Sequence, residues 1–416
     1  MSQRLKVLIS AYACQPGKGS EHEVGWEWAL QMARFHDVTV LTRTNRRIAI
    51  EQGLQTFSSG QPRPTFTYHD LGPGLLRLKK RLRSVRLYYV LWQRSAYKVI
   101  ANLHAQHKFD LMHHVTFASY RYRTAICGHG VPAVWGPVGG IESIPPGLLP
   151  WRHPSSLFME MFRNVHTWLH ASPRYTLRQR ARAATLIVAS TPAMQGAFKN
   201  LGINAELMPA IGLNPEEIPH RPRHPTAGPL KLLFVGNILA LKGLDLALEA
   251  LLLSQTDASL TLAGDGPYLK SLKRSVAEHH LQNRVTFLGR LPRTEVLHLY
   301  PNYDAFLFPS LHDTGGYAVI EAMSNELPVI CLDCGGPALA VQPDCGFKVP
   351  LGPRREVIRN LAAAIQTYTR DRKLITLHGQ NARQSALKNY NWQTKAERLN
   401  NYYSEAIARY PQALLS

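Results

Sequence analysis

Short runs of apolar residues alternate with longer helical patterns along the first half of the chain. The apolar runs predict strands at residues 6–12, 38–42, 66–69, 111–115, 133–135 and 186–189. Strands separated by helical segments pair in parallel, because a parallel connection needs a long crossover. The first half therefore predicts a parallel α/β domain.

A second series of the same kind follows a proline-rich stretch. Residues 214–229 read NPEEIPHRPRHPTAGP, and strands are predicted again at 231–235, 259–263, 285–288, 305–308 and 328–332. A chain of 416 residues is also too long for one core. We predict a first domain at 1–213, a linker or hinge at 214–229, and a second domain at 230–395. A C-terminal helix is expected at 396–416, with a return to the first domain as one option.

The charge is concentrated in the first half. Of the formal net charge of +20, residues 1–215 carry +16, from 26 basic and 10 acidic side chains. Residues 77–98 lie in a stretch that holds only basic charges, interleaved with aliphatic and aromatic residues. This pattern suggests a helix that contacts an anionic membrane surface, and a solvated helix face explains it equally well.

The cysteines and the hydropathy favour a cytoplasmic protein, with peripheral association at the inner face of the membrane as an extension. Five cysteines without regular spacing do not form a disulfide framework. Cys331 and Cys334 form a CxxC with Cys345 nearby, but a fourth zinc ligand is not obvious, so we favour buried thiols. The apolar runs are also shorter than the ~20 residues of a membrane-spanning helix.

Candidate ligand-binding residues follow the predicted strands, where parallel sheets bind ligands. Gly19 lies in a glycine-rich turn after the first strand. Such a turn allows backbone amides to approach a phosphate, but a simple connection from strand to helix has the same composition. In the second half, Lys242 precedes an apolar helix and Gly264 follows the next strand. Asp313 and Glu321 flank a helix start at 314–316, where carboxylates can bind hydroxyls and free amides can bind phosphate.

In order and spacing, these segments resemble the retaining glycosyltransferase family 4. The matching motifs are VGN-x4-KG at 235–243, AGDGP at 263–267, VTFLGRL at 285–291, FPS-x2-D-x2-G-x4-EAM at 308–323 and CLDCGGP at 331–337. The likeness covers the second half almost throughout and is looser in the first. It implies the α/β GT-B fold, with two Rossmann-like parallel-sheet domains facing a central cleft.

The resemblance implies roles for particular residues. Lys242 would contact the donor diphosphate, Glu321 the donor ribose and Asp313 the transferred sugar. The segment 288–291 would flank the base, and Gly19 would approach the phosphates from the opposite domain. The implied donor-binding set is Gly19, Asn237, Lys242, Gly264, Arg290, Thr314, Gly315, Gly316 and Glu321; the catalytic set is His114, Asp313 and Lys242, without a metal ligand.

The chain departs from the family pattern in several places. Asn237 stands where the family commonly has arginine, and Arg290 is our candidate for the replacement cation. Asp313 replaces a glutamate, and Glu326 replaces a glycine. Two histidines are adjacent where the family spaces them, so either His114, which we prefer, or His113 would face the sugar. A structural role is equally compatible with either histidine.

The expected function is retaining transfer of a hexose-type sugar from a nucleotide diphosphate sugar to a glycan or lipid-linked acceptor, in bacterial polysaccharide or glycolipid synthesis. No Asp-x-Asp motif occurs, so we expect no metal and no cofactor beyond the donor substrate. The alternatives are a sugar-nucleotide epimerase or a glycan phosphorylase of the same fold. A basic nucleic-acid-binding protein would suit the pI of about 9.9, but without a nucleic-acid motif we expect no nucleic acid partner.

Overall fold

The computed structural model describes residues 4–57, 60–75, 85–150, 156–158, 160–162, 164–165, 174–218 and 228–413. The chain divides into two compact domains. The first domain comprises Met1–Ile141, His170–Gly212 and Trp392–Ser416, and the second comprises Glu142–Leu169 and Leu213–Asn391. The chain therefore enters the second domain and later returns to the first.

The first domain is built on a parallel sheet of seven strands. Its order is β3-β2-β1-β4-β5-β6-β7, so the chain reverses its direction of travel across the sheet between β1 and β4. The strands are β1 (Lys6–Ser10), β2 (Asp37–Thr42), β3 (Thr65–Tyr68), β4 (Leu111–His114), β5 (Ala133–Val138), β6 (Leu186–Ala189) and β7 (Glu206–Leu207). Six of these strands were predicted, and the two-residue edge strand β7 was not.

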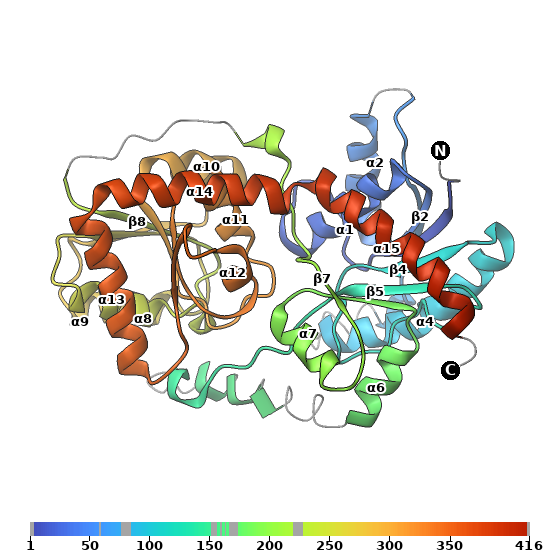
Figure 1. The fold of residues 1–416 in the computed structure, drawn as a ribbon, viewed down its shortest axis with the longest axis horizontal. Helices are drawn as coiled ribbons and strands as arrows, with labels where there is room; N and C mark the ends of the chain where they lie inside the picture. Colours follow the sequence, from blue (N-terminus) through green and yellow to red (C-terminus); the bar gives the residue numbers. More distant parts are fainter. Residues whose placement is uncertain are drawn as a thin grey trace. The chain divides into compact units, whose positions relative to one another are not determined.

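Helices connect most of these strands. They are α1 (Ser20–Ala33), α2 (Arg47–Gln55), α4 (Val85–His107), α6 (Arg174–Arg182), α7 (Pro192–Lys199) and α15 (Trp392–Ala413), with the short 3-10 helix η1 (Thr44–Arg46). The C-terminal helix α15 runs alongside α1 (Figure 1), where the Trp28 and Trp392 rings meet edge-on at 5.0 Å. Lys395 of α15 donates hydrogen bonds to the carbonyls of Pro209 and Ile211. The last helix is therefore part of the first domain's core.

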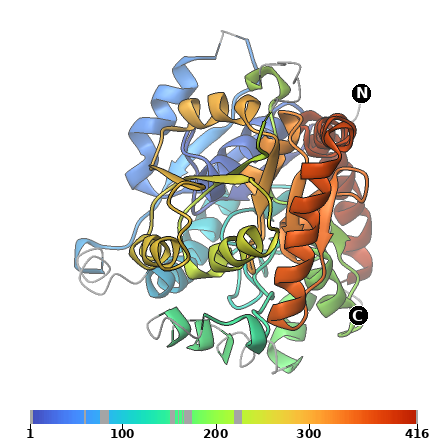
Figure 2. The same cartoon turned by 90° about the vertical axis from the view of Figure 1, so that its left-hand side faces the viewer.

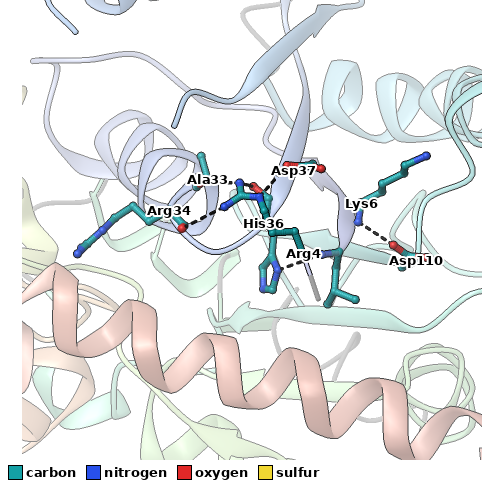
Figure 3. Close-up of polar contacts among 8 residues, drawn as sticks. Arg4, Lys6, Ala33, Arg34, His36, Asp37 and Asp110 are labelled. Atoms are coloured by element: carbon teal, nitrogen blue, oxygen red, sulfur yellow. Dashed lines mark hydrogen bonds and ion pairs between the residues drawn. The ribbon is translucent and has the colours of Figure 1, made fainter. Parts of the chain in front are cut away.

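An arginine fixes the amino edge of this sheet. Arg4 Nε pairs with Asp37 Oδ1 at 2.9 Å, and its Nη2 donates to the carbonyls of Ala33 and His36 near the end of α1 (Figure 3). Lys6 N donates to Asp110 Oδ2 at 2.7 Å on the other side of β1. A cation on the last carbonyls of a helix satisfies groups that lack a partner within the helix. These polar groups at the amino ends of the strands are therefore used in structural contacts.

The second domain, which faces the viewer in Figure 2, carries a parallel sheet. Its six strands have the order β10-β9-β8-β11-β12-β13, the doubly wound Rossmann order. The strands are β8 (Lys231–Val235), β9 (Ser259–Ala263), β10 (Val285–Gly289), β11 (Ala305–Phe308), β12 (Val329–Leu332) and β13 (Gly346–Val349). Two Rossmann-like parallel-sheet domains are therefore confirmed. The last strand, β13, was not predicted.

Seven α-helices are described in the second domain. They are α8 (Leu244–Leu253), α9 (Leu269–Glu278), α10 (Arg293–Leu299), α11 (Tyr317–Ser324), α12 (Gly335–Ala340), α13 (Arg354–Arg370) and α14 (Arg372–Tyr390); the 3-10 helices are η2 (Pro146–Leu148), η3 (Pro215–Glu217), η4 (Ala240–Lys242) and η5 (Tyr300–Asn302). Helix α13 packs against α8, and α14 packs against α11. These helices bury the apolar strands between them.

Two predicted features fall partly outside the described residues. These are the part of the linker at 219–227 and the part of the basic block at 77–84, so the hinge and the membrane contact stay predictions. Within the described residues, no helix has the length and apolar character needed to cross a bilayer.

Two helical glycines of the first domain provide a matched test of packing. A Cβ on Gly25 of α1 would lie 2.1 Å from Ala13 O, whereas one on Gly196 of α7 would meet nothing within 4 Å. We expect Gly25→Ala to lower the free energy of unfolding by about 1–3 kcal/mol. Gly196→Ala should raise it by about 0.5–1 kcal/mol, because alanine restricts the unfolded chain. Urea denaturation measures both, and equal effects would contradict the packing.

Candidate functional site

Close backbone contacts lock together the loops that follow β8 and β11. Gly243 is left-handed, with φ of 62°, and a Cβ there would lie 2.1 Å from Pro309 O. Leu311 N donates to Leu241 O at 2.9 Å across the same junction. Because β8 and β11 are the neighbours at which strand order reverses, this junction is the expected ligand-binding end of the sheet.

The loop after β12 packs against the loop after β11. Gly335 has φ of 64°, and a Cβ there would lie 2.2 Å from Asp313 O, which also accepts from Gly336 N at 2.8 Å. The Cys334 thiol donates to Ser310 O at 3.3 Å, and burial raises the pKa of this thiol to about 12. The CxxC therefore supplies a packed thiol, and the described residues contain no cluster of three or more His, Cys, Asp or Glu side chains placed to hold a metal.

Lys242 and Asp313 form an ion pair at this junction. Lys242 Nζ lies 2.5 Å from Asp313 Oδ2, and the two side chains are only 12% and 20% exposed. The other oxygen, Oδ1, accepts from the amides of Gly315 at 3.1 Å and Gly316 at 2.8 Å. Asp313 thus contacts both the predicted diphosphate cation and the predicted amide cradle. Thr314, between Asp313 and Gly315 in the sequence, is half-buried.

Glu321 lies inside α11, with 7% of the residue exposed. Its Oε1 accepts from Arg293 Nε at 3.0 Å, and its Oε2 accepts from the Tyr300 hydroxyl at 3.2 Å. Burial and the adjacent carboxylate hold the pKa of Tyr300 well above its ordinary value. Both donors orient the carboxylate and were missed by the sequence analysis. Arg293 could have been suspected from its position just after the VTFLGRL motif.

The remaining donor candidates of this domain lie at the ends of β8, β9 and β10. A Cβ on Gly264 would lie 1.8 Å from Gly236 O, so a glycine is required where these loops touch. Asn237 is exposed. Arg290 is also exposed, and the arginine that reaches Glu321 is Arg293. The role of Arg290 as a replacement cation stays a prediction.

In the first domain, Gly19 precedes α1 with φ of 67°, and its amide donates to Glu23 Oε2 at 3.2 Å. A Cβ at this position would meet nothing within 4 Å. The backbone conformation, rather than a lack of space, therefore explains the glycine. Its predicted approach to phosphate is a property of the bound state and stays a prediction.

The adjacent histidines at the end of β4 point to opposite faces of the sheet, as neighbours on a strand must. His113 Nε2 donates to Gly136 O at 2.8 Å, and its Nδ1 accepts from the Tyr403 hydroxyl at 2.7 Å. His114 Nε2 donates to Thr116 O at 2.9 Å, and its Nδ1 accepts from Thr124 Oγ1 at 2.6 Å. Both rings are buried and neutral, because burial lowers the pKa of His113 to about 3 and that of His114 to about 4.

Residues 217–385, which contain the Lys242–Asp313 pair and Glu321, match the family model described as glycosyl transferases group 1. This segment is a group 1 glycosyltransferase domain. The similarity to curated relatives extends over part of each protein. Glycogen synthase of Mycobacterium tuberculosis is 31% identical over 44% of this chain and 45% of its own length, and the sulfoquinovosyl transferase SQD2 of Arabidopsis thaliana is 27% identical over 62% and 49%. The chain thus spans about half the length of these relatives.

Solved structures resemble the whole chain, beyond the group 1 domain. Sucrose-phosphate synthase from Thermosynechococcus elongatus has a TM-score of 0.66 at 18% identity, covering 97% of this chain and 100% of that one. Anabaena Alr3699/HepE in complex with UDP and glucose has a TM-score of 0.63 at 18% identity, with the same coverage. At this identity the likeness establishes the fold, and both domains belong to a GT-B fold.

The buried histidines predict how stability depends on pH. Their pKa values are lowered by folding, so below about pH 6.5 the unfolded chain takes up protons that the folded chain refuses. The free energy of unfolding should therefore fall as the pH drops from 7 to 5, at a slope of up to about 1.4 kcal/mol per pH unit for each histidine.

Urea denaturation at pH 7, 6 and 5 measures this slope. His114→Gln removes one titrating group and should make the slope shallower, whereas His107→Gln, at an exposed position on α4, should leave it unchanged. A wild-type stability that is flat across this range would contradict the neutral, buried assignment.

Proposed function

We propose that this protein is a glycosyltransferase that moves a hexose-type sugar from a nucleotide diphosphate sugar to a glycan or lipid-linked acceptor. The observation that carries the proposal is the Lys242–Asp313 pair at the junction of β8 and β11, inside the group 1 domain. A half-buried cation at the carboxyl edge of a doubly wound sheet suits a diphosphate. HepE, which shares the fold, is described in complex with UDP and glucose, so UDP is the first nucleotide to test.

The ion pair provides a means of responding to the donor. Without an anion, the charge of Lys242 is neutralised by Asp313. A bound diphosphate supplies two further negative groups, and Lys242 exchanges Asp313 for the phosphate oxygens. The cation then stabilises the charge that develops on the leaving nucleoside diphosphate. The freed carboxylate of Asp313 accepts hydrogen bonds from hydroxyls of the transferred sugar.

Glu321 is arranged to hold the ribose of the donor. A carboxylate offers about four acceptor positions, and Arg293 and Tyr300 occupy one on each oxygen. In the proposed complex the two carboxylate oxygens also accept hydrogen bonds from the ribose hydroxyls. Arg293 and Tyr300 act as positioning residues in this proposal, because they fix the carboxylate without contacting the donor themselves.

The reaction is proposed to retain anomeric configuration and to need no metal ion. The sequence lacks an Asp-x-Asp pair, so Lys242 and the helix amides carry the charge of the leaving group. We include His114 among the proposed catalytic residues because its ring lies at the end of β4. Both of its nitrogens are occupied by Thr116 and Thr124, so a direct bond to the sugar requires release of one partner.

Donor binding tests the site. Isothermal titration with UDP and UDP-sugars should give a Kd that is about 10- to 100-fold weaker in Lys242→Ala, because a charged hydrogen bond is worth about 1.5–3 kcal/mol. Glu321→Gln should weaken binding in the same direction. Lys270→Ala, which removes the same charge from the exposed face of α9, should bind like the wild type. If all three variants bind equally, the site is wrong; if no nucleotide binds, the proposed activity fails.

Product analysis tests the stereochemistry and the metal requirement. Once a donor is found, the anomeric coupling constant in the NMR spectrum of the product should match that of the donor sugar, and added EDTA should leave the rate unchanged. An inverted product would overturn retention, and a rate that falls with EDTA and returns with Mg²⁺ would overturn metal independence.

A further inference from the structure

A cavity of about 650 Å³ lies within the first domain, lined mainly by residues of α4, α6 and the connection from β4 to β5. Five cationic side chains line it: Arg94 and Lys98 from α4, Arg121 and Arg123 from the connection, and Arg180 from α6. Pockets of this size accommodate small organic ligands. The cavity was not anticipated by the sequence analysis, which placed its ligands at the ends of the strands.

The cavity exists because one connection lacks a helix. The connections from β1 to β2, from β3 to β4 and from β5 to β6 each carry an α-helix that covers a face of the sheet. Residues 115–132, between β4 and β5, contain turns and an isolated bridge from Ser119 to Gly139, but no helix. Parallel crossovers usually pack a helix onto the sheet. Here the space between α4 and α6 is covered by a loop, and the side chain of Trp135 on β5 lies against it.

The described residues that line the cavity carry positive formal charges only. No aspartate or glutamate is among its described lining residues. Arg94 and Lys98 are four residues apart on one helix face, an arrangement of like charges that destabilises a helix. Arg94, Lys98 and Arg123 form no ion pair with the described part of the chain. Such a concentration of positive charge lowers the energy of a bound anion.

Arg180 holds the connection in place and retains a free donor. Its Nη1 donates to the carbonyls of Tyr120 at 3.1 Å and Arg121 at 2.6 Å. Its Nε and the Nε1 of Trp135 are buried N–H groups without an acceptor among the described residues. Burial, followed by repulsion from Arg123, lowers the pKa of Arg180. An oxygen ligand would relieve both the unmet donors and the repulsion.

The remaining walls are aromatic and apolar. Tyr97, Tyr122 and Trp135 line the cavity together with short side chains such as Ala125 and Ala183. Aromatic rings beside arginines suit a ligand that joins a charged group to a sugar ring or an apolar group. A fully hydrated inorganic ion would leave these surfaces unused.

We propose that this cavity is a binding site for a phosphate- or diphosphate-bearing ligand whose uncharged part packs on the aromatic wall. It does not depend on the transfer reaction proposed above, because its lining residues share no member with the donor-binding set. The cavity is nevertheless adjacent to His114, since Thr124 lines it and bonds to His114, and Gln93 lines it and bonds through Tyr89. A bound ligand would therefore contact residues that are hydrogen-bonded to the end of β4.

Inorganic pyrophosphate is the probe for the charged group. Isothermal titration is performed on the full chain carrying Lys242→Ala, which weakens any binding at the donor site. Adding Arg94→Gln, Lys98→Gln and Arg123→Gln should weaken the remaining affinity at least about tenfold. The matched control adds Arg178→Gln, Arg182→Gln and Lys199→Gln, which remove the same charge from α6 and α7 outside the cavity. It should change Kd less than about twofold.

Equal losses in the two triple variants would indicate non-specific attraction and overturn the proposal. So would the absence of pyrophosphate binding when Lys242 is replaced. If the cavity triple variant does not fold, as judged by circular dichroism, the single variant Arg123→Gln at its exposed position replaces it and should weaken binding about threefold or more. An unchanged Kd in that folded variant would also overturn the site.

Two sources of phosphate are then separated. If the ligand is a lipid headgroup, the protein should sediment with vesicles of phosphatidylcholine and phosphatidic acid. Added pyrophosphate should release the protein from the vesicles, and the cavity triple variant should not sediment with them. Glucose 1-phosphate should compete with pyrophosphate if the ligand is soluble. A site that binds pyrophosphate but neither of these probes would overturn the proposed packing of an uncharged part on the aromatic wall.

Discussion

Contacts between glycines and neighbouring carbonyls hold the carboxyl edge of the second sheet together, and the candidate donor site depends on them. Gly243 closes on Pro309, Gly264 on Gly236 and Gly335 on Asp313, each at a distance that a side chain would prevent. These contacts bring the four loops that follow β8, β9, β11 and β12 within reach of one another. Lys242 and Asp313, 71 residues apart in sequence, meet only because their backbones are already positioned.

The two domains handle positive charge in different ways. In the second domain Lys242 is paired with a carboxylate that itself accepts hydrogen bonds from two amides. In the first domain the cavity between α4 and α6 keeps its cations without lining acids in the described chain. A cation that is already paired with a carboxylate can exchange that partner for a bound phosphate. Cations without an acidic residue in the cavity lining attract an anion without such an exchange. The two arrangements suit a substrate that turns over and a ligand that stays bound.

Much of the fold could be predicted because apolar runs and glycine turns are local signals. The strands of both sheets were recognised except β7 and β13, which are short edge strands with weak patterns. Lys242, Asp313 and Glu321 were proposed as site residues from sequence motifs, and their roles stay predictions. Arg293 and Tyr300 were missed because their bond to Glu321 is tertiary, and no spacing in the sequence encodes it. The occupation of the Gly315 and Gly316 amides by Asp313 was also missed, although these hydrogen bonds span only two and three residues.

The histidines at the end of β4 mark the limit of sequence reasoning most clearly. Strand alternation predicts that His113 and His114 face opposite sides, but it does not say which side is buried. Here both sides are buried, because α15 covers one with Tyr403 and α4 covers the other with Tyr89. The C-terminal helix that buries His113 lies 290 residues away in sequence. The protonation of the first domain's core is therefore set by a segment that joins it only after the second domain has been traversed.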